Sequence, residues 1–130
     1  MADYFFDTSV LVAYFKEEDS FTVEIMEATL NGEQSASISA ITVAEICAAS
    51  DMADPALREK RLAVLNLLDV ILVDRSLAER GGEFRRKHNL ALPDALIAAC
   101  AEQSGGRFFS KDPHFDRLLS AGALSGRVYQ

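Results

Sequence analysis

Tyr4-Phe5-Phe6-Asp7-Thr8-Ser9-Val10-Leu11 is the stretch that decides the fold. Its aromatic start predicts a short buried strand, and the apolar residues that follow Ser9 at helical spacing predict a helix. Asp7 therefore lies where the strand ends and the helix begins. Because parallel α/β sheets bind ligands in the crevice beyond the carboxyl ends of their strands, Asp7 is a candidate site residue. The alternative is that Asp7 only caps the helix, as Asp often does.

Outward from this stretch, predicted helices alternate with predicted strands. The spacing of apolar residues, Gly and Pro predicts further strands over residues 35–39, 70–73, 107–110 and 127–129, and helices over residues 9–15, 21–31, 41–49, 54–68, 76–88, 93–104 and, briefly, from 113 onward. This order predicts an α/β fold with a mainly parallel central sheet and helices on both faces. We therefore expect residues 1–130 to form one domain, a three-layer α/β/α sandwich.

The composition of the chain disfavours several classes of protein. The net charge of −7 argues against a generic polyanion binder, although carboxylates gathered to hold divalent cations would give the same balance. No apolar run approaches the roughly 20 residues that span a membrane. Cys47 and Cys100 lie in apolar helical stretches without a CxxC pattern, so we expect two buried, reduced thiols in a cytoplasmic protein.

Two acids interrupt predicted helices that are otherwise apolar. Glu45 lies in the 41–49 helix, and no Lys or Arg occurs between Glu33 and Asp54 to pair with it locally. A carboxylate in such a place is unfavourable unless it binds a metal or forms a long-range salt bridge. Asp94 lies in the first turn of a helix that has no polar residue from Ala95 to Ala101. Its alternative role is to complement the helix dipole.

A fourth acid, Asp112, follows the 107–110 strand much as Asp7 follows Phe6. Right-handed crossovers bring the ends of parallel strands to one edge of a sheet, so we expect Asp7, Glu45, Asp94 and Asp112 to converge. Carboxylates at close range repel one another unless a cation is present, and sites built only from oxygen ligands favour Mg²⁺ or Mn²⁺.

Three hydroxyl residues accompany the predicted acids. Thr8, Ser9 and Ser110 could hydrogen-bond the ligating carboxylates or a metal-bound water. Alternatively, each hydroxyl only satisfies the backbone of its turn.

Four segments, 6–11, 41–45, 92–98 and 109–115, together resemble the PIN domain, and more closely the VapC toxins of bacterial toxin–antitoxin pairs. The resemblance covers essentially the whole chain. It implies a Mg²⁺- or Mn²⁺-dependent endoribonuclease whose acids match Asp7, Glu45, Asp94 and Asp112. It also implies a homodimer and a small antitoxin that threads a segment over the active site.

The last motif departs from the family pattern. His114 stands where family members often have an acid, so Asp112 is expected to supply the fourth carboxylate, with Asp116 as a lower-ranked candidate. Ser110 stands where the family often has Thr, which keeps the hydroxyl.

The expected reaction is hydrolysis of an RNA phosphodiester by in-line attack of metal-activated water. Asp7, Asp94 and Asp112 would bind the metal, and Glu45 would ligate it or orient the water. Arg85, Arg86 and Lys87 either form a solvated helix face or guide the RNA backbone. Three alternatives stay open: a non-catalytic PIN-like interaction module, a DNA-cutting nuclease of the same fold, and a receiver domain, which the lack of adjacent acids after the first strand disfavours.

Overall fold

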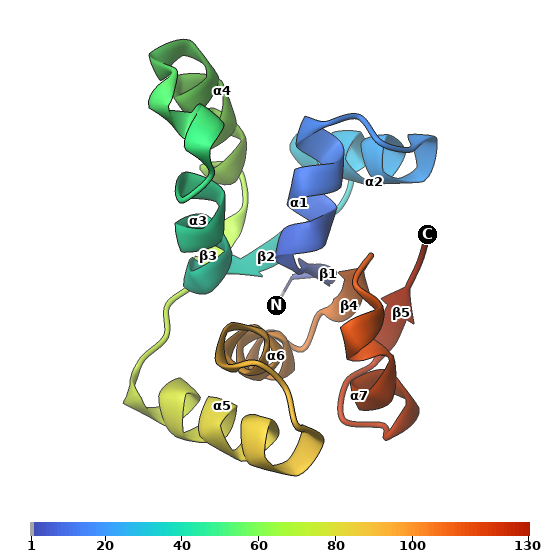
Figure 1. The fold of residues 1–130 in the computed structure, drawn as a ribbon. Helices are drawn as coiled ribbons and strands as arrows, with labels where there is room; N and C mark the ends of the chain where they lie inside the picture. The colour runs from blue at the N-terminus through green and yellow to red at the C-terminus, as the bar shows by residue number, and fades with distance from the viewer. Residues whose placement is uncertain (1) are drawn as a thin grey trace.

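The computed structural model describes residues 2–130 as an alternation of short strands and helices (Figure 1). In chain order the elements are β1 (Tyr4–Phe6), α1 (Thr8–Phe15), α2 (Ser20–Leu30), β2 (Ala36–Ser39), α3 (Ala40–Cys47), the 3₁₀ helix η1 (Ser50–Ala53), α4 (Pro55–Leu65), β3 (Asp69–Ile71), α5 (Arg75–His88), α6 (Leu92–Ser104), β4 (Arg107–Ser110), the 3₁₀ helix η2 (Pro113–Phe115), α7 (Asp116–Ser120) and β5 (Gly126–Val128).

The strands form one sheet in the order β3-β2-β1-β4-β5, and every pairing is parallel. β1 lies at the centre, where Phe6 is in register with Phe109 of β4. Parallel neighbours need crossover connections, and the helices between the strands supply them. The predicted parallel α/β fold is therefore confirmed.

Helices cover both faces of the sheet. In Figure 1, α1 to α4 lie on one side of the strands and α5 to α7 on the other. Successive side chains of a strand point to opposite faces, so Phe5 packs into the core under α5 to α7 while Phe6 packs into the core under α1 to α4. The predicted three-layer sandwich is confirmed by these two separate apolar cores.

The bounds of two elements, β3 and α4, differ from those expected from the sequence. β3 covers Asp69–Ile71 instead of 70–73, and α4 ends at Leu65 instead of near residue 68. β3 is an edge strand on which Val70 is exposed, and Leu72, directly after it, is exposed as well. Periodicity could not distinguish this exposed edge from a buried strand, because both are short aliphatic runs.

The expectation that Glu45 and Cys47 are buried is wrong. α3 buries only Thr42 and Ile46, which share one face of the helix at a spacing of four residues. Glu45 and Cys47 lie off that face and are exposed. Small alanines around them suggested a buried helix, but these alanines are also largely at the surface. Cys100 is buried as expected, inside α6.

α6 is the buried helix that the sequence predicted. From Ile97 to Ala101 every residue is buried, and the helix ends at Gly105, whose φ of 68° is left-handed and favours glycine. Gly81 of α5 allows close packing, because a Cβ there would lie 2.6 Å from Leu96. In the described range 2–130, no helix combines the length and the apolar character that crossing a membrane requires.

Candidate active site

The candidate acids lie at the carboxyl edge of the sheet. Asp7 follows β1, and Asp112 follows the neighbouring strand β4 after Ser110 and Lys111. α3 starts directly after β2, and its Glu45 faces α1. Asp94 lies in the first turn of α6. Four segments far apart in the sequence therefore contribute one carboxylate each to this edge.

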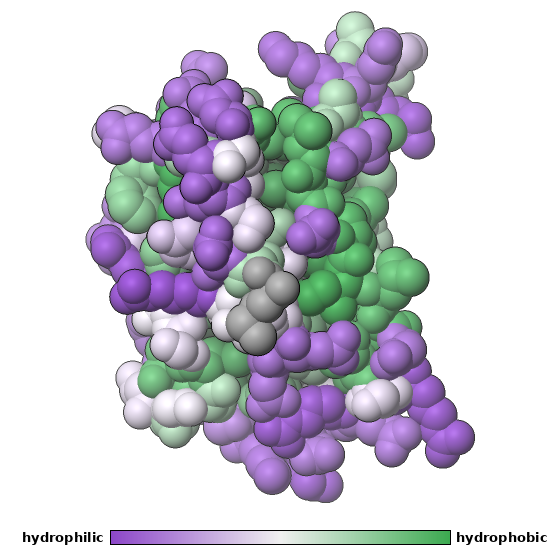
Figure 2. Space-filling view, turned by 180° about the vertical axis from the view of Figure 1, so that it is seen from behind, coloured by the Kyte–Doolittle hydropathy of each residue, from purple (hydrophilic) through white to green (hydrophobic). Residues whose placement is uncertain are grey.

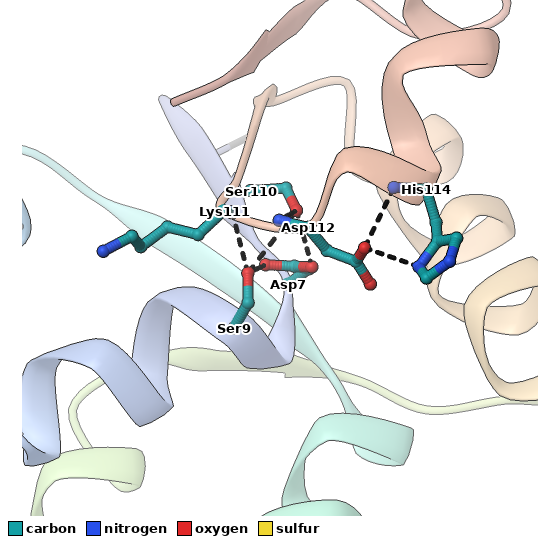
Figure 3. Close-up of polar contacts among 6 residues, drawn as sticks. All are labelled: Asp7, Ser9, Ser110, Lys111, Asp112 and His114. Carbon is teal, nitrogen blue, oxygen red and sulfur yellow. Dashed lines mark hydrogen bonds and ion pairs between the residues drawn. The ribbon is translucent and has the colours of Figure 1, made fainter. Parts of the chain in front are cut away.

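Two serine hydroxyls fix the Asp7 carboxylate (Figure 3). Ser9 donates to Oδ1 at 2.6 Å and Ser110 donates to Oδ2 at 2.8 Å. Both hydroxyls also accept from backbone N–H groups: Ser9 from Lys111 at 2.8 Å, and Ser110 from Asp112 at 2.9 Å. Through Asp7, the two serines thus join the ends of β1 and β4. They bond the carboxylate in addition to the backbone N–H groups of the turn.

Asp7 is 3% exposed, and this burial raises its pKa to about 6. The hydrogen bonds from Ser9 and Ser110 oppose the rise, and the charge of Asp112 adds to it. Asp7 occupies the N-cap position of α1, but its side chain makes no capping hydrogen bond. The two serine hydroxyls make the closest contacts of this carboxylate, which is held in a place that disfavours its charged form.

Asp112 interacts chiefly with His114 (Figure 3). One oxygen, Oδ1, accepts from the His114 backbone N–H at 2.9 Å and lies 2.7 Å from the ring atom Nδ1. Asp112 thereby caps η2 and is partly exposed. The residue that breaks the family pattern is thus the one that holds the fourth acid.

Asp94 is partly buried, and no hydrogen bond to its carboxylate forms within residues 2–130. Burial is the largest cause that raises the pKa of Asp94, and the negative charges of Asp112 and Glu45 raise it further. The nearby His114 lowers it. The same charges would not act on Asp94 if the acids were scattered. Asp94 therefore lies within electrostatic range of Asp112 and Glu45.

A threonine pair holds Glu45. Thr8 donates to Oε1 of Glu45 at 2.6 Å, and its Oγ1 lies 2.9 Å from Oγ1 of the fully buried Thr42. Since the Thr8 proton is directed at Glu45, Thr42 is the donor to Thr8. Thr42 was not among the sequence-predicted site residues, because a buried Thr in a helix gives no distinctive pattern.

The donor set fits an oxygen-preferring divalent cation. Within residues 2–130, no Lys or Arg forms an ion pair with Asp7, Glu45, Asp94 or Asp112. Their mutual repulsion is therefore left for a cation to relieve. Among the described residues, no three Asp, Glu, His or Cys side chains converge tightly enough to hold an ion, so the acids do not form a ready-made cation site in this conformation.

The other predicted site residues lie apart from these acids. Arg85 donates to the Leu90 carbonyl at 2.8 Å, Lys87 lies 3.9 Å from Glu83, and Arg86 is exposed on the same helix. Asp116 is exposed in the first turn of α7. A role for these residues in substrate binding or in the site stays a prediction.

One ion pair near the site had no signal in the sequence. Lys111 Nζ lies 2.5 Å from Oδ2 of Asp19, which also caps α2 through the backbone N–H of Thr22. This contact anchors the loop between Ser110 and Asp112 to α2. The two partners lie 92 positions apart, and neither belongs to a motif, so only the fold brings them together.

Fold and site together define a parallel α/β protein with carboxylates at the carboxyl edge of its sheet. The family model of the PIN domain matches residues 4–119, and the chain belongs to the PIN domain family. Members of this family are generally nucleases. Curated protein sequences give no significant match.

Solved structures of similar fold include three complexes. A toxin–antitoxin complex from Klebsiella pneumoniae is 24% identical, with a TM-score of 0.72 over 86% of this chain and 89% of that one. VapBC2 from Rickettsia felis, bound to a DNA fragment from its promoter, is 17% identical, with a TM-score of 0.76 over 98% of both chains. DNA-bound VapBC from Salmonella typhimurium is 22% identical, with a TM-score of 0.70 over 99% of this chain and 98% of that one. At these identities the likeness shows the shared fold.

Proposed function

We propose that this chain is a Mg²⁺- or Mn²⁺-dependent endoribonuclease and the toxin of a toxin–antitoxin pair. The observation that carries the proposal is the group of Asp7, Asp94, Asp112 and Glu45. The charge of Asp112 raises the pKa of Asp7, the charges of Asp112 and Glu45 raise the pKa of Asp94, and no Lys or Arg of residues 2–130 forms an ion pair with these acids. Family membership supports the nuclease part. The solved relatives described as toxin–antitoxin complexes support the toxin part.

Each acid has a distinct part in the proposed reaction. A bound divalent cation supplies charge neutralisation at the phosphate and activation of water. Asp7, Asp94 and Asp112 would hold it, and Ser9 and Ser110 keep Asp7 in one orientation through both of its oxygens. Glu45, exposed and fixed by Thr8, would ligate the ion or orient the attacking water.

An antitoxin segment has a suitable surface next to the acids. A hollow of about 380 Å³ is lined by Val12, Phe15 and Ile46 and by Glu45 itself. A second hollow of about 170 Å³ between α1, α2 and α4 shares Phe15 and Arg61 with the first. Together they form a partly apolar path that ends at the site. A chain segment lying in this path would reach Glu45.

The homodimer in this proposal is supported by the free edge of the sheet. Leu67 is 64% exposed and Leu72 is 72% exposed, and both flank the edge strand β3. Figure 2 shows hydrophobic surface on the side of the molecule where α4 and β3 lie. Contiguous exposed apolar surface usually marks an interaction site, and a sheet edge offers unpaired backbone groups.

The remaining parts of the proposal concern setting and substrate approach. Both cysteines are free thiols, which agrees with a cytoplasmic location. Residues 1–130 would act as one domain. Arg85, Arg86 and Lys87, at the end of α5, would guide the RNA backbone towards the site from outside.

The test is a cleavage assay on matched substrates. Purified protein is incubated with single-stranded RNA, and with DNA of the same sequence, in Mg²⁺, Mn²⁺ or EDTA. The proposal expects cation-dependent cleavage of RNA that Asp94→Asn abolishes and that Glu59→Gln, which changes an exposed acid on α4, retains. Preferential cleavage of DNA would point to the DNA-cutting alternative, and no cleavage of either would favour the non-catalytic module.

A further inference from the structure

A further hollow borders Asp94, and Glu45 is not part of its lining. Its volume is about 360 Å³, and its lining includes His88 and Asn89 from the end of α5, Asp94 of α6, His114 of η2 and Arg117 of α7. We call it the Arg117 hollow. Asp94 is one of the candidate ligands and His114 contacts another, Asp112, so the hollow is continuous with the candidate site.

Arg117 is the permanent positive charge of this hollow. It is exposed and forms no ion pair with any residue in the range 2–130, as is also true of Arg58 and Arg107. Arg117 differs from these in that it lines a hollow together with the candidate ligand Asp94. The His114 ring uses Nδ1 for Asp112, which leaves its Nε2 available for another partner. Although the protein carries a net charge of −7, an unpaired guanidinium can bind an anion through charge-assisted hydrogen bonds.

The hollow on the Glu45 side has the opposite character. Its arginine, Arg61, is already held by both oxygens of Asp51, at 2.8 and 2.9 Å, and Val12, Phe15 and Ile46 give the lining an apolar part. A phosphate has no free guanidinium to bind there. The two hollows therefore differ in their cations: the Arg117 hollow holds an unpaired guanidinium, whereas the Glu45-side hollow holds a paired arginine and the exposed ammonium group of Lys16.

We propose that the Arg117 hollow binds the phosphate that adjoins the scissile one in a single-stranded nucleic acid, with the Arg117 guanidinium as the main contact. This inference rests on the proposed nuclease function and assigns its substrate-binding subsite. The volume lies within the range of about 300 to 1,000 Å³ of small-ligand sites, which suits one nucleotide of a single strand. The basic run at the end of α5 leads directly to His88 at the rim of the hollow.

The test measures binding separately from cleavage. Affinity for a fluorescent RNA oligonucleotide is measured by anisotropy in EDTA, in the Asp7→Asn background, because Asp7 does not line the hollow. Arg117→Gln is expected to weaken binding about tenfold, as loss of a charged hydrogen bond does. It should also reduce the slope of log affinity against log salt by about 0.7, the value of one phosphate contact on a single strand. Arg58→Gln, which removes an equally exposed charge on α4, is expected to change neither quantity.

Neutral methylphosphonate linkages locate the contact. Placed one at a time along the oligonucleotide, they should weaken binding most at one linkage next to the cut, and Arg117→Gln should abolish the effect of that linkage alone. Equal losses for Arg117→Gln and Arg58→Gln, an unchanged linkage profile, or no binding by the parent protein would overturn the inference. Arg117-dependent binding without any cleavage would overturn the proposed nuclease function and leave the phosphate site standing.

Discussion

Ser110 and Asp7 lie 103 positions apart in the sequence, and the Ser110 hydroxyl donates a 2.8 Å hydrogen bond to Oδ2 of Asp7. Both residues are buried. The bond crosses between the adjacent strands β1 and β4 at their carboxyl ends. Ser9 donates to the other carboxylate oxygen, Oδ1, so both oxygens of this buried group accept a hydrogen bond. The site therefore depends on the pairing of the two central strands.

Removing the Ser110 hydroxyl should destabilise the protein. Ser110→Ala leaves a buried carboxylate oxygen without its donor, which costs about 1 to 3 kcal/mol in the free energy of unfolding. Ser110→Thr keeps the hydroxyl and serves as the matched control. Urea denaturation at pH 7 of both variants measures the difference. Equal stability of Ser110→Ala and the unsubstituted protein would show that this bond does not support Asp7.

The pKa of Asp7 predicts how stability depends on pH. Its folded value of about 6 lies above the ordinary 3.8, so the folded state holds the proton more tightly than the unfolded state. The contribution of Asp7 to stability is therefore full below pH 3.8 and is lost as pH rises through 6. A shift of about two pKa units corresponds to roughly 3 kcal/mol.

Asp7→Asn should lack this part of the pH dependence. Without divalent cations, the variant should be as stable as the unsubstituted protein or more so above pH 6, because a neutral amide avoids the buried charge. Denaturant unfolding between pH 4 and 7 compares it with Asp116→Asn, which changes an exposed acid. Parallel stability curves for Asp7→Asn and the unsubstituted protein would contradict the raised pKa.

The Thr8 hydroxyl should matter for activity through Glu45. Thr8→Val removes the donor to Glu45, and loss of a contact that orients a ligand typically lowers activity about tenfold or more. Thr8→Ser keeps the hydroxyl and should retain most of the activity. Initial rates of RNA cleavage, with thermal unfolding measured in parallel, distinguish this effect from misfolding. Equal cleavage rates for Thr8→Val and Thr8→Ser would show that the Thr8 hydroxyl does not position Glu45 for the reaction.

The apolar edge at β3 should hold the homodimer together. Leu72→Glu places a charge in that surface and is expected to convert a dimer into a monomer without loss of fold. Leu92→Glu changes another exposed leucine, at the start of α6, and should leave the dimer intact. Sedimentation velocity measures the oligomeric state. A monomeric unsubstituted protein, or the same state for both variants, would rule out this interface.

The sequence predicted those features that local patterns encode. The run through Phe6 and Asp7 marks a strand that ends at an acid, and the alternation of elements gives the parallel α/β fold. The buried helix after Asp94 follows from its unbroken apolar run. These features depend on neighbours within a few residues, so one sequence is enough to find them.

Features that depend on tertiary packing were not predictable. Whether α3 is buried on one face or all round is set by the elements around it, so Glu45 and Cys47 were wrongly expected to be buried. The contacts of Thr8 with Thr42 and of Lys111 with Asp19 join residues that are distant in sequence. The position of Arg117 beside Asp94 likewise appears only when α6 and α7 are placed on the sheet.

The most direct test of the central claim is a Mn²⁺ titration followed by calorimetry. If the four carboxylates close around a divalent cation, the unsubstituted protein should bind Mn²⁺ saturably and become more stable in proportion, by about 2.7 kcal/mol at a hundredfold excess over Kd. Asp7→Asn and Asp94→Asn should lose both effects, and Glu59→Gln, which changes an exposed acid on α4, should keep them. No saturable binding by the unsubstituted protein, or unchanged binding in Asp7→Asn and Asp94→Asn, would contradict the account.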